Sequence, residues 1–216
     1  MRIGVIVAMD KELAELRAAL GGESGVTGGN SVTVRRCGVG KVNSALGADE
    51  LIRAFHPDLI VSTGVAGGAG AGIGVRDVVV GSEYRYHDVY CGEGFEYGQV
   101  MGLPAAFTAS RELVGKAASL SCGTAVHPGL IVSGDFFVDT AGKMREILRR
   151  FPAAKAVDME SCSIAQTCHV RGVPFISFRI ISDIPLEGNN AGQYDDFWED
   201  LARGSFSVTR EFLEAV

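Results

Sequence analysis

Short runs of apolar residues alternate along the chain with stretches in which apolar residues return at helical spacing. Residues 3–8 are mostly apolar and rich in β-branched side chains, and they predict a buried first strand. Leu13, Leu16 and Leu20 then share one stripe of a predicted helix over residues 11–20. Asp10 is the expected N-cap of this helix, and the glycine pair that follows is expected to end it.

The same alternation continues to the end of the sequence. Further strands are expected at residues 31–36, 59–62, 75–80, 129–133, 156–157 and 175–181. Further helices are expected at residues 42–55, 111–120, 143–150, 160–169 and 194–215, and a turn at residues 63–68. This order predicts a three-layer α/β/α fold, in which helices cover both faces of a central mixed and twisted sheet. With 216 residues, the chain 1–216 is expected to form a single domain.

Composition and charge restrict the partners of this fold. The formal net charge is -6, and the basic residues are scattered, which argues against a nucleic-acid partner and is compatible with a small, largely neutral ligand. The five cysteines are odd in number and form no CxxC pair, so free thiols in a reducing compartment are expected. The apolar N-terminal run is too short for a signal sequence, and no stretch has the roughly 18 apolar residues that span a bilayer. We therefore expect a cytoplasmic protein without membrane spans.

The candidate site residues lie where the predicted strands end, which is where ligands bind in open α/β sheets. Four of five such ends carry carboxylates, and a parallel sheet would bring them close together. A single carboxylate after a strand is more often a helix cap, and Asp10 is expected to be only that. The residues at these ends are Met9, Asp10 and Glu12; residues 64–68; residues 133–138; Asp158, Met159 and Glu160; and Ser182 and Asp183.

Several common motifs are absent. The segment GVGK at residues 38–41 resembles the end of a phosphate-binding P-loop, but Val42 stands where Ser or Thr is needed and Arg35 where the first Gly belongs. The glycines of residues 64–74 do not form GxGxxG, and no GxSxG accompanies the four histidines. A dinucleotide, a nucleoside triphosphate and a covalent triad are therefore not indicated.

Six segments in order along nearly the whole chain resemble a known family. They are MRIGVIVAMDKELAEL, STGVAGG, RYHD with FEYGQ, LIVSGDFFV, AVDMESCSIAQTCH and FRIISD. Together they are similar to 5'-methylthioadenosine/S-adenosylhomocysteine nucleosidases of the purine nucleoside phosphorylase superfamily. The resemblance implies a phosphorylase/hydrolase-like fold. It also implies hydrolysis of the bond between adenine and a 5'-substituted ribose, with 5'-deoxyadenosine as a further candidate substrate. No cofactor or metal is implied.

The resemblance also implies roles for particular residues. Asp183 would be the general acid that protonates adenine, and Glu12 would activate the attacking water. Glu160 would hold the ribose hydroxyls, beside Met159 packed on the sugar, and Arg179 would steady the ribose and the water.

The remaining implied contacts surround the base and the 5'-group. Phe137 would stack on adenine, and the backbone of Val138 would read its edge. Met9 and Phe197 would line the pocket of the 5'-alkylthio group, although Phe197 could instead anchor the last helix in the core. Ser182 and Val65 complete the expected substrate-binding set.

The sequence departs from the family pattern at three places, namely Val65, the long loop, and residues 184–190 after the last strand. Val65 stands where the bacterial nucleosidases carry Ser, so a hydroxyl near the ribose or water is lost. In the long loop of residues 87–107, Glu93 and Met101 replace an aromatic residue and a proline that commonly cap the 5'-group from the neighbouring subunit. A homodimer whose partner loop lies near the site is expected, and the preferred 5'-substituent stays open.

Alternatives to this hydrolase remain. A phosphate-dependent phosphorylase would need cationic or amide groups for the anion, whereas Asp10 and Glu12 at the first strand end would repel phosphate, which favours water. A hydrolase of futalosine-type nucleosides would differ only at the 5'-group. A non-catalytic nucleoside sensor would have no use for the three acids Glu12, Glu160 and Asp183.

Overall fold

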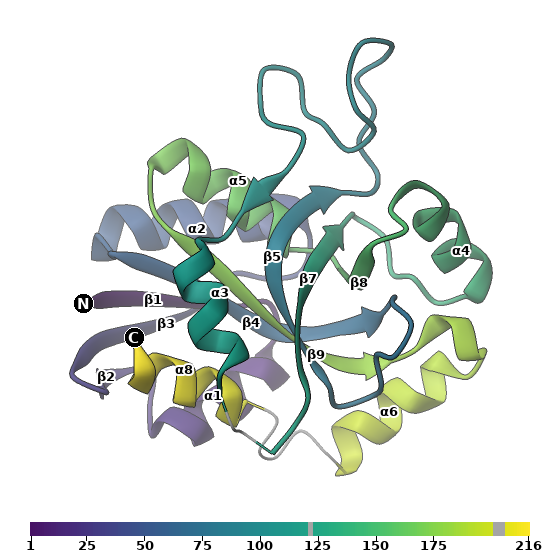
Figure 1. Ribbon diagram of the computed structural model, residues 1–216. Coiled ribbons are helices and arrows are strands. Elements are labelled where there is room, and N and C mark those ends of the chain that lie inside the picture. Colours follow the sequence, from purple (N-terminus) through teal and green to yellow (C-terminus); the bar gives the residue numbers. More distant parts are fainter. Residues whose placement is uncertain (121–122, 201–205) are drawn as a thin grey trace.

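The computed structural model describes residues 1–120, 123–200 and 206–216. In these ranges nine strands form one mixed sheet, in the order β2-β3-β1-β4-β8-β7-β5-β6, with β9 between β4 and β5 (Figure 1). The strands are β1 Arg2–Val7, β2 Ser24–Thr27, β3 Asn30–Arg36, β4 Leu59–Gly68, β5 Val78–Tyr86, β6 Phe107–Thr108, β7 Val126–Ser133, β8 Ala154–Asp158 and β9 Phe175–Asp183.

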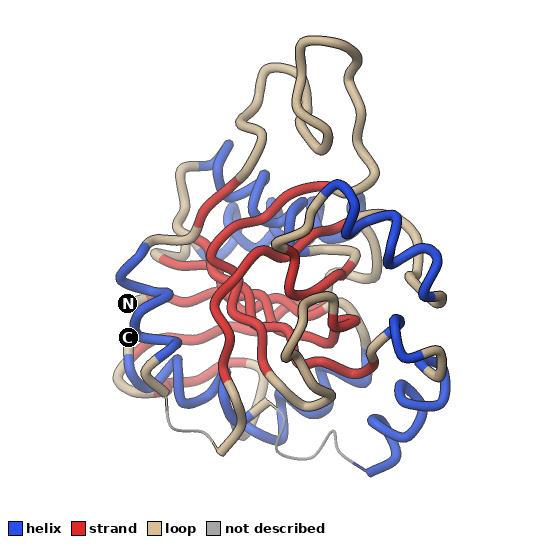
Figure 2. The backbone as a smooth tube through the Cα atoms, turned by 45° about the vertical axis from the view of Figure 1, so that its right-hand side comes forward, coloured by secondary structure: helices blue, strands red, loops and turns tan. Residues whose placement is uncertain are grey.

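Helices cover both faces of the sheet, as Figures 1 and 2 show. They are α1 Asp10–Leu20, α2 Lys41–Phe55, α3 Arg111–Ala118, α4 Ala141–Arg150, α5 Ser161–Arg171, the short 3-10 helix η1 Pro185–Glu187, α6 Asn190–Asp200 and α8 Ser207–Ala215. One apolar core joins the sheet to α1, α3, α6 and α8, and a second joins it to α2 and α5. The predicted three-layer mixed α/β fold is confirmed.

The position of β9 distinguishes this sheet from a simple open one. Strand β9 is parallel to β4 on one side and antiparallel to β5 on the other. Because β4 also pairs with β8, β8 with β7 and β7 with β5, these five strands close into a ring. All nine residues of β9 are buried, as its sequence FISFRIISD and its central place require.

Local sequence explains where most helices begin and end. Helix α1 ends at Gly21 and α5 at Gly172, both with positive φ (75° and 69°), a conformation that glycine adopts without a side-chain clash. The predicted stop of the first helix is thus confirmed. Ser110 and Thr140 accept hydrogen bonds from backbone N–H groups in the first turns of α3 and α4, as N-caps do.

Several local predictions were wrong. Residues 63–68 continue β4 instead of turning, because residues 63–67 pair in parallel with β9 and residues 67–68 pair antiparallel with β8. Asp10 is the first residue of α1 rather than its cap. Strand β2, which pairs antiparallel with β3, was not predicted because its residues are mostly exposed and give no apolar signal.

Within the described residues, the segment 194–215, predicted as one closing helix, is divided between α6 and α8. Its residues 201–205 lie outside the described part of the chain, as does Cys122. The other four cysteines are free thiols.

Residues 87–106, called the arm from here on, project from the body of the fold between β5 and β6 (Figures 1 and 2). Tyr90 and Met101 on the arm are exposed. Among the described helices, none has the length and apolar character needed to cross a membrane.

Candidate active site

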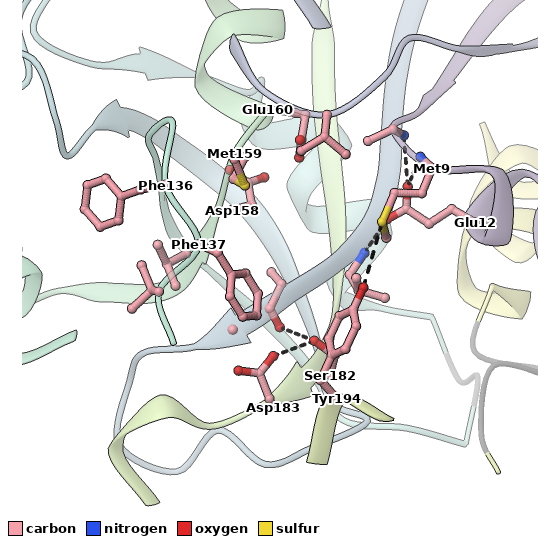
Figure 3. A pocket seen from close by; sticks show the side chains of 17 residues that line it. Met9, Glu12, Phe136, Phe137, Asp158, Met159, Glu160, Ser182, Asp183 and Tyr194 are labelled. Atoms are coloured by element: carbon pink, nitrogen blue, oxygen red, sulfur yellow. Dashed lines mark hydrogen bonds between the residues drawn. The ribbon is translucent and has the colours of Figure 1, made fainter. Parts of the chain in front are cut away.

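A cavity lies where β1, β8 and β9 end and β4 bends beside them (Figure 3). The space between its walls, with the open mouth included, is roughly 690 Å³. The residues that line it are Ala8, Met9, Glu12, Val39, Val65, Ala66, Gly67, Phe136, Phe137, Val138, Val157, Asp158, Met159, Glu160, Ser182, Asp183 and Tyr194.

Glu12 is fixed by the backbone around it. Its Oε2 accepts hydrogen bonds from the amides of Ala8 and Met9, both at 2.9 Å, and its Oε1 accepts one from the amide of Val65 at 3.0 Å. Burial raises the pKa of Glu12, while the Arg179 guanidinium and these three amides oppose that rise. A carboxylate held on three sides in this way keeps one orientation toward the cavity.

The absence of a side chain at Gly64 on β4 leaves room for the Glu12 carboxylate. A Cβ atom at Gly64 would lie 2.5 Å from Oε1 of Glu12, so only glycine leaves room for the carboxylate there. Glu12 therefore depends on two elements, α1 for its backbone and β4 for the space and amide that it uses.

Asp183 and Ser182 reach the cavity together from the end of β9 (Figure 3). Neighbouring residues in a regular strand point to opposite faces. Here the pairing of β9 with β4 shifts between Ala66 and Gly67, so that Gly67 pairs with Asp183 and Ser182 is the extra residue of a bulge. Both side chains consequently line one cavity, and Ser182 Oγ donates a 2.7 Å hydrogen bond to Oδ1 of Asp183.

Glu160 comes from the turn between β8 and α5. Its Oε1 accepts a 2.9 Å hydrogen bond from the amide of Gly40, and only 7% of the residue is exposed. Burial, together with the negative charge of Asp158, raises the pKa of Glu160 to about 7, against the lowering effect of Arg179. Glu160 is thus a carboxyl group that takes up or releases a proton near neutral pH.

A buried ion pair lies beneath these acids. Arg179 Nε contacts Oδ2 of Asp158 at 2.6 Å, and both side chains are almost completely buried. Arg179 Nη2 also donates to Ser62 Oγ at 3.0 Å. Asp158 in turn accepts hydrogen bonds from the hydroxyls of Ser133 and Ser161, so its charge is fully solvated by protein groups. The guanidinium is therefore held in place and already paired.

Apolar and aromatic side chains form the rest of the wall. Phe137 and Tyr194 meet edge to face, with ring centroids 6.0 Å apart, and Tyr194 Oη lies 3.8 Å from Sδ of Met9. Phe136 and Phe137 are 40% and 50% exposed, which is unusual for such large apolar side chains. Flat apolar surfaces beside converging acids suit a flat, largely neutral ligand.

The structure brings all but two of the predicted site residues to this cavity. Arg179 is not among the residues that line the cavity, but its buried charge acts on both Glu12 and Glu160. Phe197 is wholly buried in the core and is not among the residues that line the cavity, which favours the alternative that it anchors the helix. The aromatic residue of α6 that lines the cavity is Tyr194, three positions earlier. The roles predicted for the residues that do meet there stay predictions.

Eight lining residues lie outside the predicted catalytic and substrate-binding set. They are Ala8, Val39, Ala66, Gly67, Phe136, Val157, Asp158 and Tyr194. Phe136 and Tyr194 had a signal in the sequence, since Phe136 follows a strand end and Tyr194 begins the last predicted helix among aromatic residues. Val39 lies in the GVGK segment, which has no motif that would have indicated it.

Comparisons with known proteins agree with the fold. The model of the phosphorylase superfamily matches residues 2–214, and the chain belongs to this superfamily. A 5'-methylthioadenosine/S-adenosylhomocysteine nucleosidase of Exiguobacterium sp. is 40% identical, with 100% of both chains covered. The nucleosidase of Desulfotalea psychrophila is 37% identical, with 99% of this chain and 97% of the relative covered.

Solved structures give the same result. The Neisseria meningitidis nucleosidase in complex with methylthio-immucillin-A superposes with a TM-score of 0.91 and 35% identity, covering 100% of this chain and 99% of that one. The Colwellia psychrerythraea nucleosidase in complex with adenine has a TM-score of 0.89 and 35% identity, covering 100% and 96%. Within the superfamily, the chain belongs to the 5'-methylthioadenosine/S-adenosylhomocysteine nucleosidases.

Proposed function

We propose that this protein hydrolyses the N-glycosidic bond of 5'-methylthioadenosine and S-adenosylhomocysteine, releasing adenine and the 5'-substituted ribose. The observation that carries this proposal is the convergence of Glu12, Glu160 and Asp183, from three distant segments, on one cavity with aromatic walls. Membership of the nucleosidase family supports the choice of bond and substrates.

The reaction needs a proton at the leaving group and a nucleophile at the sugar. In our proposal the protonated carboxyl of Asp183 gives its proton to a ring nitrogen of adenine while the bond to the anomeric carbon breaks. Water then forms the new C–O bond, and Glu12 accepts the proton that the water loses. The positive charge that develops on the sugar is stabilised by the carboxylates around it.

Glu160 is proposed to bind the ribose hydroxyls. Its Oε1 already accepts from Gly40, which leaves Oε2 for the sugar. Met159 beside it would pack on the sugar ring, while Phe137 stacks on adenine and the backbone of Val138 reads the edge of the base. Tyr194, rather than Phe197, would lie with Met9 at the 5'-group.

Charge favours water over phosphate as the nucleophile. A phosphorylase needs unpaired cations or amides for its anion. Here Arg179 is paired with Asp158, and the amides of Ala8, Met9 and Val65 are used by Glu12. A phosphate in this position would face the negative charge of Glu12 instead of free donors.

The protein is further proposed to act in the cytoplasm as a homodimer in which the partner's arm lies near each site. The projection of the arm from the body of the fold, with Tyr90 and Met101 exposed on it, supports a role in contacts between subunits (Figure 1).

One assay tests the reaction and its alternatives. Adenine release is measured in phosphate-free buffer from methylthioadenosine, S-adenosylhomocysteine, 5'-deoxyadenosine and adenosine, with a futalosine-type nucleoside in parallel. We expect release from the first two without phosphate. A requirement for phosphate, with a sugar 1-phosphate as product, would replace hydrolysis by phosphorolysis, and faster cleavage of the futalosine-type nucleoside would change the substrate.

A further inference from the structure

The GVGK segment, residues 38–41, ends in a lysine whose side chain meets two carboxylates near the cavity. Lys41 Nζ lies 2.8 Å from Oδ2 of Asp88 and 3.8 Å from Oδ2 of Asp135, and 5.4 Å from the ring centroid of Tyr86. Lys41 and Asp88 have side chains that are only 23% and 16% exposed. An ion pair that is shielded to this extent fixes geometry better than one on the open surface.

Backbone amides connect the same groups. Asp88 Oδ2 accepts a 2.8 Å hydrogen bond from the amide of Asp135, and Asp135 Oδ1 accepts a 2.7 Å hydrogen bond from the amide of Lys41. Three loops are thereby joined, namely residues 38–41 before α2, the root of the arm at residues 87–88, and the loop after β7 that begins at residue 134. We call Lys41, Asp88 and Asp135 the loop cluster.

Two parts of the proposed active site depend directly on the loop cluster. The residue before Lys41 is Gly40, whose amide donates to Glu160 and whose backbone has a φ of 94°. The residues after Asp135 are residues 136–138, which form the aromatic wall. A displacement of Lys41 or Asp135 would therefore be passed on to Glu160 and to this wall through one peptide unit each.

Close packing leaves little tolerance for such a displacement. A Cβ atom at Gly40 would lie 3.1 Å from Oδ1 of Asp135. On the other side, a Cβ atom at Gly134 would lie 2.3 Å from the ring of His87, which stacks edge to face on Phe136 with centroids 4.8 Å apart. The backbones of Gly40 and Gly134 thus lie directly against side chains of the neighbouring loops, and the charged side chains determine how the loops are held together.

We propose that Lys41 is a positioning residue, which holds the Gly40 amide against Glu160 and residues 136–138 against the nucleoside through its ion pairs with Asp88 and Asp135. This inference rests on the proposed function, because it assigns the loop cluster to ribose and base binding. Asp183 and Glu12 are held by β9 and α1 instead. Loss of the cluster should consequently weaken substrate binding more than it slows the bond cleavage.

The test compares Lys41→Met with Lys116→Met, which removes an exposed lysine paired with Glu112 on α3. For Lys41→Met we expect the KM for methylthioadenosine and the Kd for adenine, measured by titration calorimetry, to rise about 10-fold or more, since hydrogen-bonded charges of this kind have such an effect. The fall in kcat should be smaller than the rise in KM. Lys116→Met should leave all three values within twofold of the unaltered protein.

Two more variants separate positioning from a general loss of structure. Lys41→Arg keeps the charge and should recover most of the adenine affinity. Asp88→Asn removes the partner charge, and combined with Lys41→Met it should weaken binding little beyond either change alone, because both act through one cluster. Thermal unfolding of each variant shows that the fold is retained.

The outcomes distinguish this inference from the proposed function. Adenine affinity in Lys41→Met equal to that in Lys116→Met would overturn the inference, and so would full additivity of the Lys41 and Asp88 changes. A different outcome is that the unaltered protein binds adenine but releases none from the nucleosides, and that Lys41→Met loses adenine binding. This result would reject the proposed reaction and keep the positioning role.

Discussion

The ionised carboxylate of Glu160 lowers the stability of the folded protein, and this effect can be measured apart from the reaction. The residue is 7% exposed, and its carboxyl lies near Asp158 and Glu12, with Arg179 as the nearby cation. Its pKa is raised from 4.5 to about 7 in the folded protein. The folded state therefore binds this proton more tightly than the unfolded state does. The corresponding stability is fully present below pH 4.5 and is lost as the pH rises to about 7.

The size of this effect follows from the two pKa values. The difference between 4.5 and about 7 corresponds to about 3 kcal/mol of unfolding free energy. Glu160→Gln cannot ionise, but its side-chain carbonyl can still accept the hydrogen bond of the Gly40 amide. We expect Glu160→Gln to be more stable than the unaltered protein at pH 8 by up to about 3 kcal/mol, or roughly 6–12 °C in Tm, while it binds ribose less well.

Urea unfolding of both proteins at pH 5 and at pH 8 measures this difference. For each protein, the change in unfolding free energy between pH 5 and pH 8 is calculated. Subtracting one protein's change from the other's removes the contributions of the titrating groups that both proteins share. Glu112→Gln, at an exposed position on α3, is the matched control and should follow the unaltered protein. A stability gap between Glu160→Gln and the unaltered protein that does not widen from pH 5 to pH 8 would refute the argument.

Three further predictions concern the acids and the aromatic residues. Asp183→Asn should lower kcat by about 10²–10⁴-fold because it removes the proton donor, while calorimetry still detects adenine binding; retention of kcat would exclude Asp183 as the acid. Gly64→Ala should reduce kcat/KM by up to about 100-fold, since its Cβ would displace Glu12, 2.5 Å away, and a crystal structure with Glu12 unmoved would contradict this. Phe197→Ala should lower the unfolding free energy by about 3–5 kcal/mol, whereas Tyr194→Ala should mainly raise KM. The reverse pattern in urea unfolding and kinetics would show that Phe197, and not Tyr194, contacts the substrate.

Much of the fold could be predicted because the buried strands and amphipathic helices leave periodic patterns. Strand β9 is the clearest example, since nine consecutive residues are buried and five of them are Phe or Ile. The convergence of Glu12, Glu160 and Asp183 could also be predicted, because all three follow strand ends. The segment after Thr63 could not, since its glycines indicate a turn unless the pairing of β4 with β9 is known.

The choice between Tyr194 and Phe197 shows a second limit. Three residues apart on one helix, they lie on neighbouring but distinct parts of its surface. Which of them meets the core and which the cavity depends on the rotation of α6 about its axis, and that rotation is set by packing on the sheet. Likewise, the contacts of Lys41 with Asp88 and Asp135 join residues more than forty positions apart, and no local pattern reports them.

The extra residue in β9 has a consequence for how this chain can change over time. Substitutions at Ser182 or Asp183 alter one chemical group each and leave the other in place. The only residue between Ile181 and Asp183 is Ser182, so a one-residue deletion there would remove both the bulge and the hydroxyl that donates to Oδ1 of Asp183. The length of this strand end is therefore under stricter constraint than its composition.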